Sequence, residues 1–142
     1  MKPVSHLLEG RESTLWHARP DDTVFQALHL LAEHEAGALM VMDQGRLVGI
    51  LSERDYTRKI ALQGRNSKDT LVKEIMTREV LYVTPRTRTR ECMALMAEKK
   101  IRHLPVIDGD TVVGMISVRD ILDDIIADHE ETIAQLENYI RS

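Results

Sequence analysis

Two copies of a serine–arginine–aspartate motif hold the side chains best suited to bind a small ligand: Ser52-Glu53-Arg54-Asp55 and Ser117-Val118-Arg119-Asp120. Each serine ends an apolar run, so we expect it where a strand meets the N-terminus of a helix. Free N–H groups and the helix dipole favour an anion there, and an ionised aspartate can accept both hydroxyls of a ribose. An arginine in the first turn opposes the dipole, which suggests an anionic partner. The motif therefore predicts a nucleotide-like ligand.

The same serine and aspartate could instead cap their helices, because Ser-x-x-Asp is close to a capping box. A single copy would favour the capping role. The presence of two copies, each with an arginine, favours the ligand. The two roles can also coexist.

The chain contains an internal repeat that places the two motifs at equivalent positions. Ala36–Ile60 aligns without gaps to Ile101–Ile125 at an offset of 65 residues, with nine identities among 25 positions. Such a repeat indicates two copies of one structural unit. At 142 residues, the two copies together can bury a usable core where one alone would be marginal.

The apolar spacing and the turn residues of each copy predict the element order β-α-β-β-α. In the first copy we expect an extended Ser13–His17, a helix capped by Asp22 or Thr23, strands at Ala38–Met42 and Arg46–Leu51, and a helix from Ser52 through Leu62. In the second we expect an extended Leu81–Val83, a helix at Thr89–Lys99, strands at Leu104–Ile107 and Thr111–Ile116, and a helix from Ser117. Thr70–Met76 reads as a short helix, with Val4–Leu8 as its counterpart. The expected segments are 1–64, the first unit with an N-terminal extension; 65–126, a linker and the second unit; and 127–142, a helical extension.

The repeated signature Gly-x-x-Ser-x-Arg-Asp resembles that of the CBS-domain family. The strings Arg102-His103-Leu104-Pro105-Val106 and Glu74-Ile75-Met76-Thr77 resemble family motifs as well. The resemblance covers about residues 4–126. It implies an α/β (α+β) fold in which two units pack about a pseudo-twofold axis as a stand-alone tandem pair, or Bateman module, and usually dimerise. It also implies a sensor that binds AMP, ADP, ATP, S-adenosylmethionine or NAD-type ligands in clefts between the sheets.

The resemblance also suggests which residues line the clefts. By analogy with the family these are Gly37, Ala38 and Met40 in the first copy, and Arg102, His103 and Pro105 in the second. Further basic residues that could complete a phosphate pocket are Arg58, Lys59 and Lys68, although each alone is more often a solvated surface charge. Trp16 and Thr84 are weaker candidates for adenine or ribose contacts. Because the first cleft would be small and apolar and the second basic, we expect unequal affinities.

Composition argues against several other functions. A net charge of −4 disfavours binding to nucleic acid or an acidic membrane. The single cysteine, Cys92, excludes an internal disulfide and a multi-cysteine metal site, and favours a reducing cytoplasm. No histidine spacing suits a metal, and no nucleophile–base pair suggests an enzyme. The leading alternative is an interaction or scaffolding module with vestigial clefts; a nucleic-acid-binding regulator is less favoured.

An uninterrupted helical pattern runs from Arg119 to about Ile140. Leu122, Ile126, His129, Ile133, Leu136 and Ile140 step by 4, 3, 4, 3 and 4 residues, a heptad seam with one polar position. The flanks are acidic. We expect the seam to pair with its mate in a homodimer; folding back onto its own chain is the alternative.

The sequence as a whole predicts a non-enzymatic, cytoplasmic module that binds an adenine nucleotide of the AMP, ATP or NAD type. Ligand binding would change the surface shown to a regulated protein.

Overall fold

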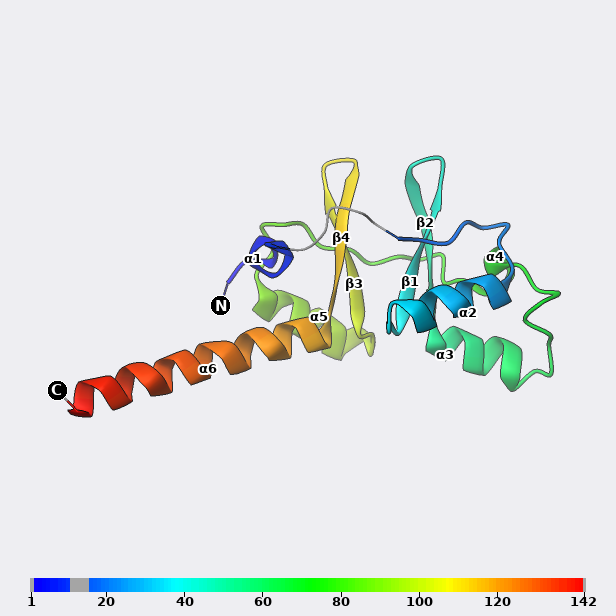
Figure 1. Ribbon diagram of the computed structural model, residues 1–142. Helices are drawn as coiled ribbons and strands as arrows, with labels where there is room; N and C mark the ends of the chain where they lie inside the picture. Colours follow the sequence, from blue (N-terminus) through cyan, green and yellow to red (C-terminus); the bar gives the residue numbers. More distant parts are fainter. Residues whose placement is uncertain (1, 11–15, 142) are drawn as a thin grey trace. The chain divides into compact units, whose positions relative to one another are not determined.

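The computed structural model describes residues 2–10 and 16–141, which form two compact units (Figure 1). Among the described residues, the first-repeat unit comprises 16–81 and 109–112, and the second-repeat unit comprises 2–10, 82–108 and 113–141. These units divide the chain differently from the segments expected from the sequence. Residues 2–10 belong with the second repeat, and the linker from residue 65 belongs with the first.

The first-repeat unit is built around a two-stranded antiparallel hairpin. Its elements are α2 (Val24–Glu33), β1 (Ala38–Asp43), β2 (Arg46–Ser52), α3 (Glu53–Tyr56), the π-helical turn η1 (Thr57–Ala61) and α4 (Val72–Ile75). Thr23 caps α2, because its hydroxyl accepts from the Gln26 N–H while the Gln26 side chain accepts from the Thr23 N–H. The hairpin turns at Gln44 and Gly45, both at positive φ.

The second-repeat unit repeats this plan. Its elements are α1 (Val4–Leu8), α5 (Thr89–Lys99), β3 (His103–Asp108), β4 (Thr111–Ser117, which enters this unit at Val113) and α6 (Val118–Arg141). Lys100, at φ +56°, adopts the left-handed conformation that ends α5. The first strand expected in each repeat is reduced to a single parallel bridge, Ala18 with Val41 and Val83 with Val106. Residues 13–15 of that expected strand lie outside the described residues.

Matching backbone hydrogen bonds explain why each short helix joins the unit it does. The Val72 N–H donates to the Asp22 carbonyl at 2.8 Å, and the Val4 N–H donates to the Thr87 carbonyl at 2.8 Å. Asp22 and Thr87 occupy equivalent positions in the two repeats. The helices α1 and α4 are therefore structural counterparts, as the sequence predicted. Each is hydrogen-bonded to the residue that lies two positions before the first long helix of its repeat.

Each unit has its own hydrophobic core beneath its hairpin. Leu39, Leu51 and Ile60 are buried in the first, and Leu104, Ile116 and Ile121 in the second. Burying one such side chain contributes about 1.5–3 kcal/mol. Among the described residues, no helix is both long and apolar enough to span a bilayer.

Candidate functional site

Ser52 and Asp55 form a complete capping box where β2 passes into α3. The Asp55 N–H donates to Ser52 Oγ at 3.1 Å, and the Ser52 N–H donates to Asp55 Oδ2 at 3.0 Å. The Ser52 hydroxyl also donates to Asp55 Oδ2, at 3.1 Å. The capping role that the sequence left open is thus present in the structure.

The Asp55 carboxylate also has partners from beyond its own turn. Lys59 Nζ lies 3.0 Å from Oδ1, and the Thr77 hydroxyl is 3.3 Å from Oδ1 and 3.4 Å from Oδ2. Lys59 Nζ donates in addition to the Ile75 carbonyl at 2.8 Å. With only 7% of its surface exposed, Asp55 joins α3 to the segment around α4. A ribose could reach this carboxylate only by replacing one of these partners.

Ser117 and Asp120 repeat the capping box at the start of α6. The Ser117 N–H donates to Asp120 Oδ2 at 2.7 Å, and the Asp120 N–H donates to Ser117 Oγ at 3.2 Å. Asp120 is half-buried, so it is more open to solvent than Asp55. The position equivalent to Lys59 is Asp124, which reverses the charge beside the motif. The two sites therefore differ electrostatically, in a direction that the sequence analysis did not anticipate.

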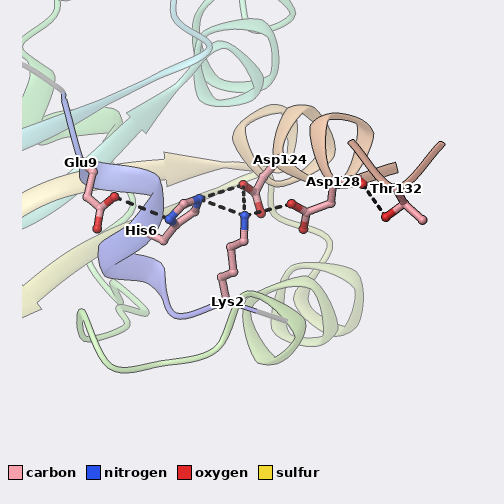
Figure 2. A network of polar contacts seen from close by, with 6 residues as sticks. All are labelled: Lys2, His6, Glu9, Asp124, Asp128 and Thr132. Carbon is pink, nitrogen blue, oxygen red and sulfur yellow. Dashed lines mark hydrogen bonds and ion pairs between the residues drawn. The ribbon is translucent and has the colours of Figure 1, made fainter. Parts of the chain in front are cut away.

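A polar network joins the N-terminal segment to α6 within the second-repeat unit (Figure 2). Lys2 Nζ lies 2.9 Å from Asp128 Oδ1 and 3.8 Å from Asp124 Oδ1, while His6 Nε2 lies 3.2 Å from the same Asp124 oxygen. His6 Nδ1 lies 3.6 Å from Glu9 Oε2. The hydrogen bond between Lys2 and Asp128 raises the pKa of Lys2 and lowers the pKa of Asp128. The network pins the α1 segment to α6.

The backbone places Gly37 and Arg102 at matching positions beside the two motifs. The Glu53 N–H donates to the Gly37 carbonyl, and the Val118 N–H donates to the Arg102 carbonyl, each at 3.0 Å. Ala38 pairs with Ser52 in the β1–β2 register. The side chains of Ala38, Met40 and Pro105 are buried, and that of His103 is half-buried. These residues thus lie next to the motifs within their own units.

Several other candidates have local partners. Trp16 stacks on His34 with ring centroids 4.1 Å apart, and Lys68 Nζ lies 4.9 Å from the centre of the Phe25 ring. The Thr84 and Thr87 hydroxyls are 3.2 Å apart. These contacts anchor the three candidates inside their own units. Arg54, Arg58 and Arg119 are exposed.

Sequence reasoning overlooked Thr77, Lys2 and His6 as functional neighbours. Thr77 was visible only as the end of the Glu74–Thr77 string, and nothing local links it to Asp55.

Within the described residues, no group of three or more His, Cys, Asp or Glu could hold a metal ion. Cys92 is buried, and desolvation raises its pKa to about 11.

Comparison with known proteins adds an independent result. The model of the CBS domain family matches residues 13–62 and 72–127. The mitochondrial CBS domain-containing protein CBSX3 of Arabidopsis thaliana is 42% identical over 134 residues, which are 91% of this chain and 65% of CBSX3. The chain thus spans just under two thirds of that relative.

Solved structures agree with the sequence match. A signal-transduction candidate with CBS domains from Burkholderia ambifaria is 45% identical, with a TM-score of 0.86 over 89% of this chain and 96% of that chain. A hexameric CBS-CP12 protein from bloom-forming cyanobacteria is 29% identical, with a TM-score of 0.74 over 94% of this chain and 86% of that one.

One structural relative carries ligands. The CBS domain pair of protein MJ0100, in complex with 5′-methylthioadenosine and S-adenosyl-L-methionine, has a TM-score of 0.78 over 89% of this chain and 98% of that chain. At 24% identity it supports the fold alone. The MJ0100 pair thus binds two adenosyl compounds, and the CBS-CP12 protein is a hexamer. With the duplicated hairpins, the paired capping boxes and the family match in agreement, this chain belongs to the CBS-domain family and carries two CBS domains in tandem.

Proposed function

We propose that the chain is a non-enzymatic sensor that binds an adenine nucleotide of the AMP, ATP or NAD type and thereby changes its interaction with a regulated protein. The observation that carries the proposal is the duplicated capping box, which places a hydroxyl, a carboxylate and an exposed arginine at the N-terminus of a helix in each unit. These groups suit a ribose and a phosphate. The adenosyl ligands of the MJ0100 pair support the same class.

We propose further that the motif of the second repeat binds the ligand more tightly. Asp55 is 7% exposed and already holds Lys59 and Thr77, so a ribose must displace a partner there. Asp120 is half-buried, so its carboxylate is more accessible to a ribose than that of Asp55. The sequence predicted unequal affinities without an order; the order proposed here rests on the sequestration of Asp55.

Thermal-shift measurements across AMP, ADP, ATP, NAD and S-adenosylmethionine test the ligand class. A ligand at 100 times its dissociation constant stabilises the protein by about 2.7 kcal/mol, so a true ligand should raise the melting temperature clearly. Calorimetric titration of the best ligand should then show binding weakened by about 10–100-fold in Asp120→Ala, in line with the loss of a charge-assisted hydrogen bond.

The matched control is Glu131→Ala, which removes an exposed carboxylate from the same helix at a distance from Asp120 along the chain. It should leave the affinity unchanged. A melting temperature that no adenosyl compound moves would reject the sensor in favour of an interaction or scaffolding module. The saturated hydrogen bonding of Asp55 is the observation that favours this second candidate.

The homodimer and the cytoplasmic location remain predictions. The oligomeric CBS-CP12 relative supports self-association. The compartment rests on the single cysteine, and the relative CBSX3 is described as mitochondrial.

A further inference from the structure

Helix α6 carries an apolar face that the described part of its own chain leaves uncovered. This face, the α6 seam, consists of Leu122, Ile126, His129, Ile133, Leu136 and Ile140. The exposed fractions of its apolar members are 47% for Leu122, 54% for Ile126, 55% for Ile133, 57% for Leu136 and 81% for Ile140. The alternative in which the seam folds back onto its own chain is therefore not seen.

The chain packs a different side of α6 into its core. Ile121 is buried and Ile125 packs against the same cluster, whereas Leu122 and Ile126, one residue further along, face solvent. Beyond those turns the helix continues as a single rod to Arg141 (Figure 1). An apolar stripe this long on the surface marks an interaction site.

We propose that the occupant of the α6 seam is the α6 seam of a second copy, and that the two helices lie parallel. The heptad steps make the seam complementary to itself along its whole length, which is what a twofold-symmetric pair requires. The acidic edge of the seam, formed by Asp123, Glu130 and Glu137, disfavours an anionic membrane surface as the occupant.

The charges beside the seam determine the direction. Asp123, Glu130 and Glu137 recur every seven residues along one edge of the seam, while Thr132 and Tyr139 recur along the other. An antiparallel pair would bring the two acidic edges together, so that like charges face each other. A parallel pair sets each acidic edge beside the neutral edge of its mate. Coulomb repulsion therefore favours the parallel arrangement.

The parallel arrangement also gives His129 a defined position. As the one polar member of the seam, it would meet His129 of the second copy in a single layer between Ile126 and Ile133. A polar residue at one core position of a helix pair specifies register and costs stability. Replacement by leucine should therefore tighten the pair.

Sedimentation equilibrium of the full chain and its variants tests the pairing. The wild type should sediment at twice its chain mass of 16.2 kDa. His129→Leu should lower the dissociation constant at least tenfold, and Ile133→Asp should raise it at least tenfold, since a change of 1.4 kcal/mol is a factor of about ten. Glu131→Ala, on the side of the helix away from the seam, is the matched control and should change nothing.

A disulfide cross-link tests the direction. Ile140→Cys brings two thiols together in a parallel pair and places them far apart in an antiparallel one. Because the native Cys92 is buried, it does not compete with the introduced thiol for formation of the intermolecular disulfide in the Ile140→Cys variant. Mild oxidation should give a covalent dimer.

Three results would overturn the inference: a wild type that is monomeric at about 100 µM, a dimer that Ile133→Asp leaves intact, or a dimer in which Ile140→Cys does not cross-link. Ile133 is 55% exposed, so its replacement should not unfold the chain, which circular dichroism verifies. Because none of these measurements involves an adenosyl compound, their failure would be distinct from a failure of the proposed sensor function.

Discussion

Replacing Asp55 should destabilise the protein more than replacing its repeat counterpart Asp120. Both aspartates complete a capping box, whose loss costs about 1 kcal/mol. The Asp55 carboxylate in addition accepts a hydrogen bond from the Thr77 hydroxyl and forms an ion pair with Lys59. A hydrogen bond to a charged group contributes about 1.5–3 kcal/mol, discounted here by the long Thr77 distances of 3.3 and 3.4 Å.

The Lys59 pair adds little to that total. Its side chain is 40% exposed and is rehydrated when the carboxylate is removed, so the pair contributes about 0–1 kcal/mol. For Asp55→Ala we therefore expect a loss of about 2–3 kcal/mol in the free energy of unfolding. Asp120 is more exposed to water than Asp55, so its polar contacts contribute less, and for Asp120→Ala we expect a smaller loss, of about 1 kcal/mol.

Urea titration measures both variants, and the two units offer separate signals. Trp16 is the only tryptophan and packs against the core of the first-repeat unit, so its fluorescence reports the unit that contains Asp55. Circular dichroism follows α6 for Asp120→Ala. Glu53→Ala, an exposed acid in the same turn as Asp55, is the control and should cost only a few tenths of a kcal/mol. A loss below about 1 kcal/mol for Asp55→Ala would show that the internal network is not structural.

Two further predictions concern close packing and the buried thiol. Gly49→Ala should destabilise more than Gly114→Ala, because the Cβ added at Gly49 would lie 3.0 Å from the backbone carbonyl oxygen of Thr77, as well as 2.7 Å from Met76 Sδ, whereas the Cβ added at Gly114 would meet only the Leu8 side chain, at 3.0 Å. Urea midpoints compare the two variants, and equal losses would contradict the difference. Cys92, with its pKa raised to about 11, should resist alkylation in the native protein at pH 8 and react after unfolding. The contribution of this buried thiol to stability is fully present below its unfolded pKa of about 8.5 and is lost as the pH rises through 11; rapid native alkylation at pH 8 would contradict its burial.

Local signals in the sequence predicted most of the secondary structure. The helix Thr89–Lys99 was predicted with its observed bounds, and the four hairpin strands differ from their predicted bounds by one residue at one or both ends. The information is local, because alternating burial, turn residues and capping side chains act within a few positions of each other. The Ser52–Asp55 box was visible for the same reason.

The π-helical turn Thr57–Ala61 lay beyond these signals. The sequence predicted a continuous helix from Ser52 through Leu62, and the helical path is present but widened by the turn. Its residues have ordinary helical character, so nothing in their types marks the change.

What the sequence determined by itself was the duplicated unit and the family, because both rest on spacings that are conserved between the two copies. Only the tertiary structure decided which distant side chains contact each motif. Thr77 reaches Asp55 from 22 residues away, and Lys2 reaches Asp128 from 126 residues away. Contacts at such separations depend on how the elements pack, and side-chain type alone does not encode which distant partner arrives.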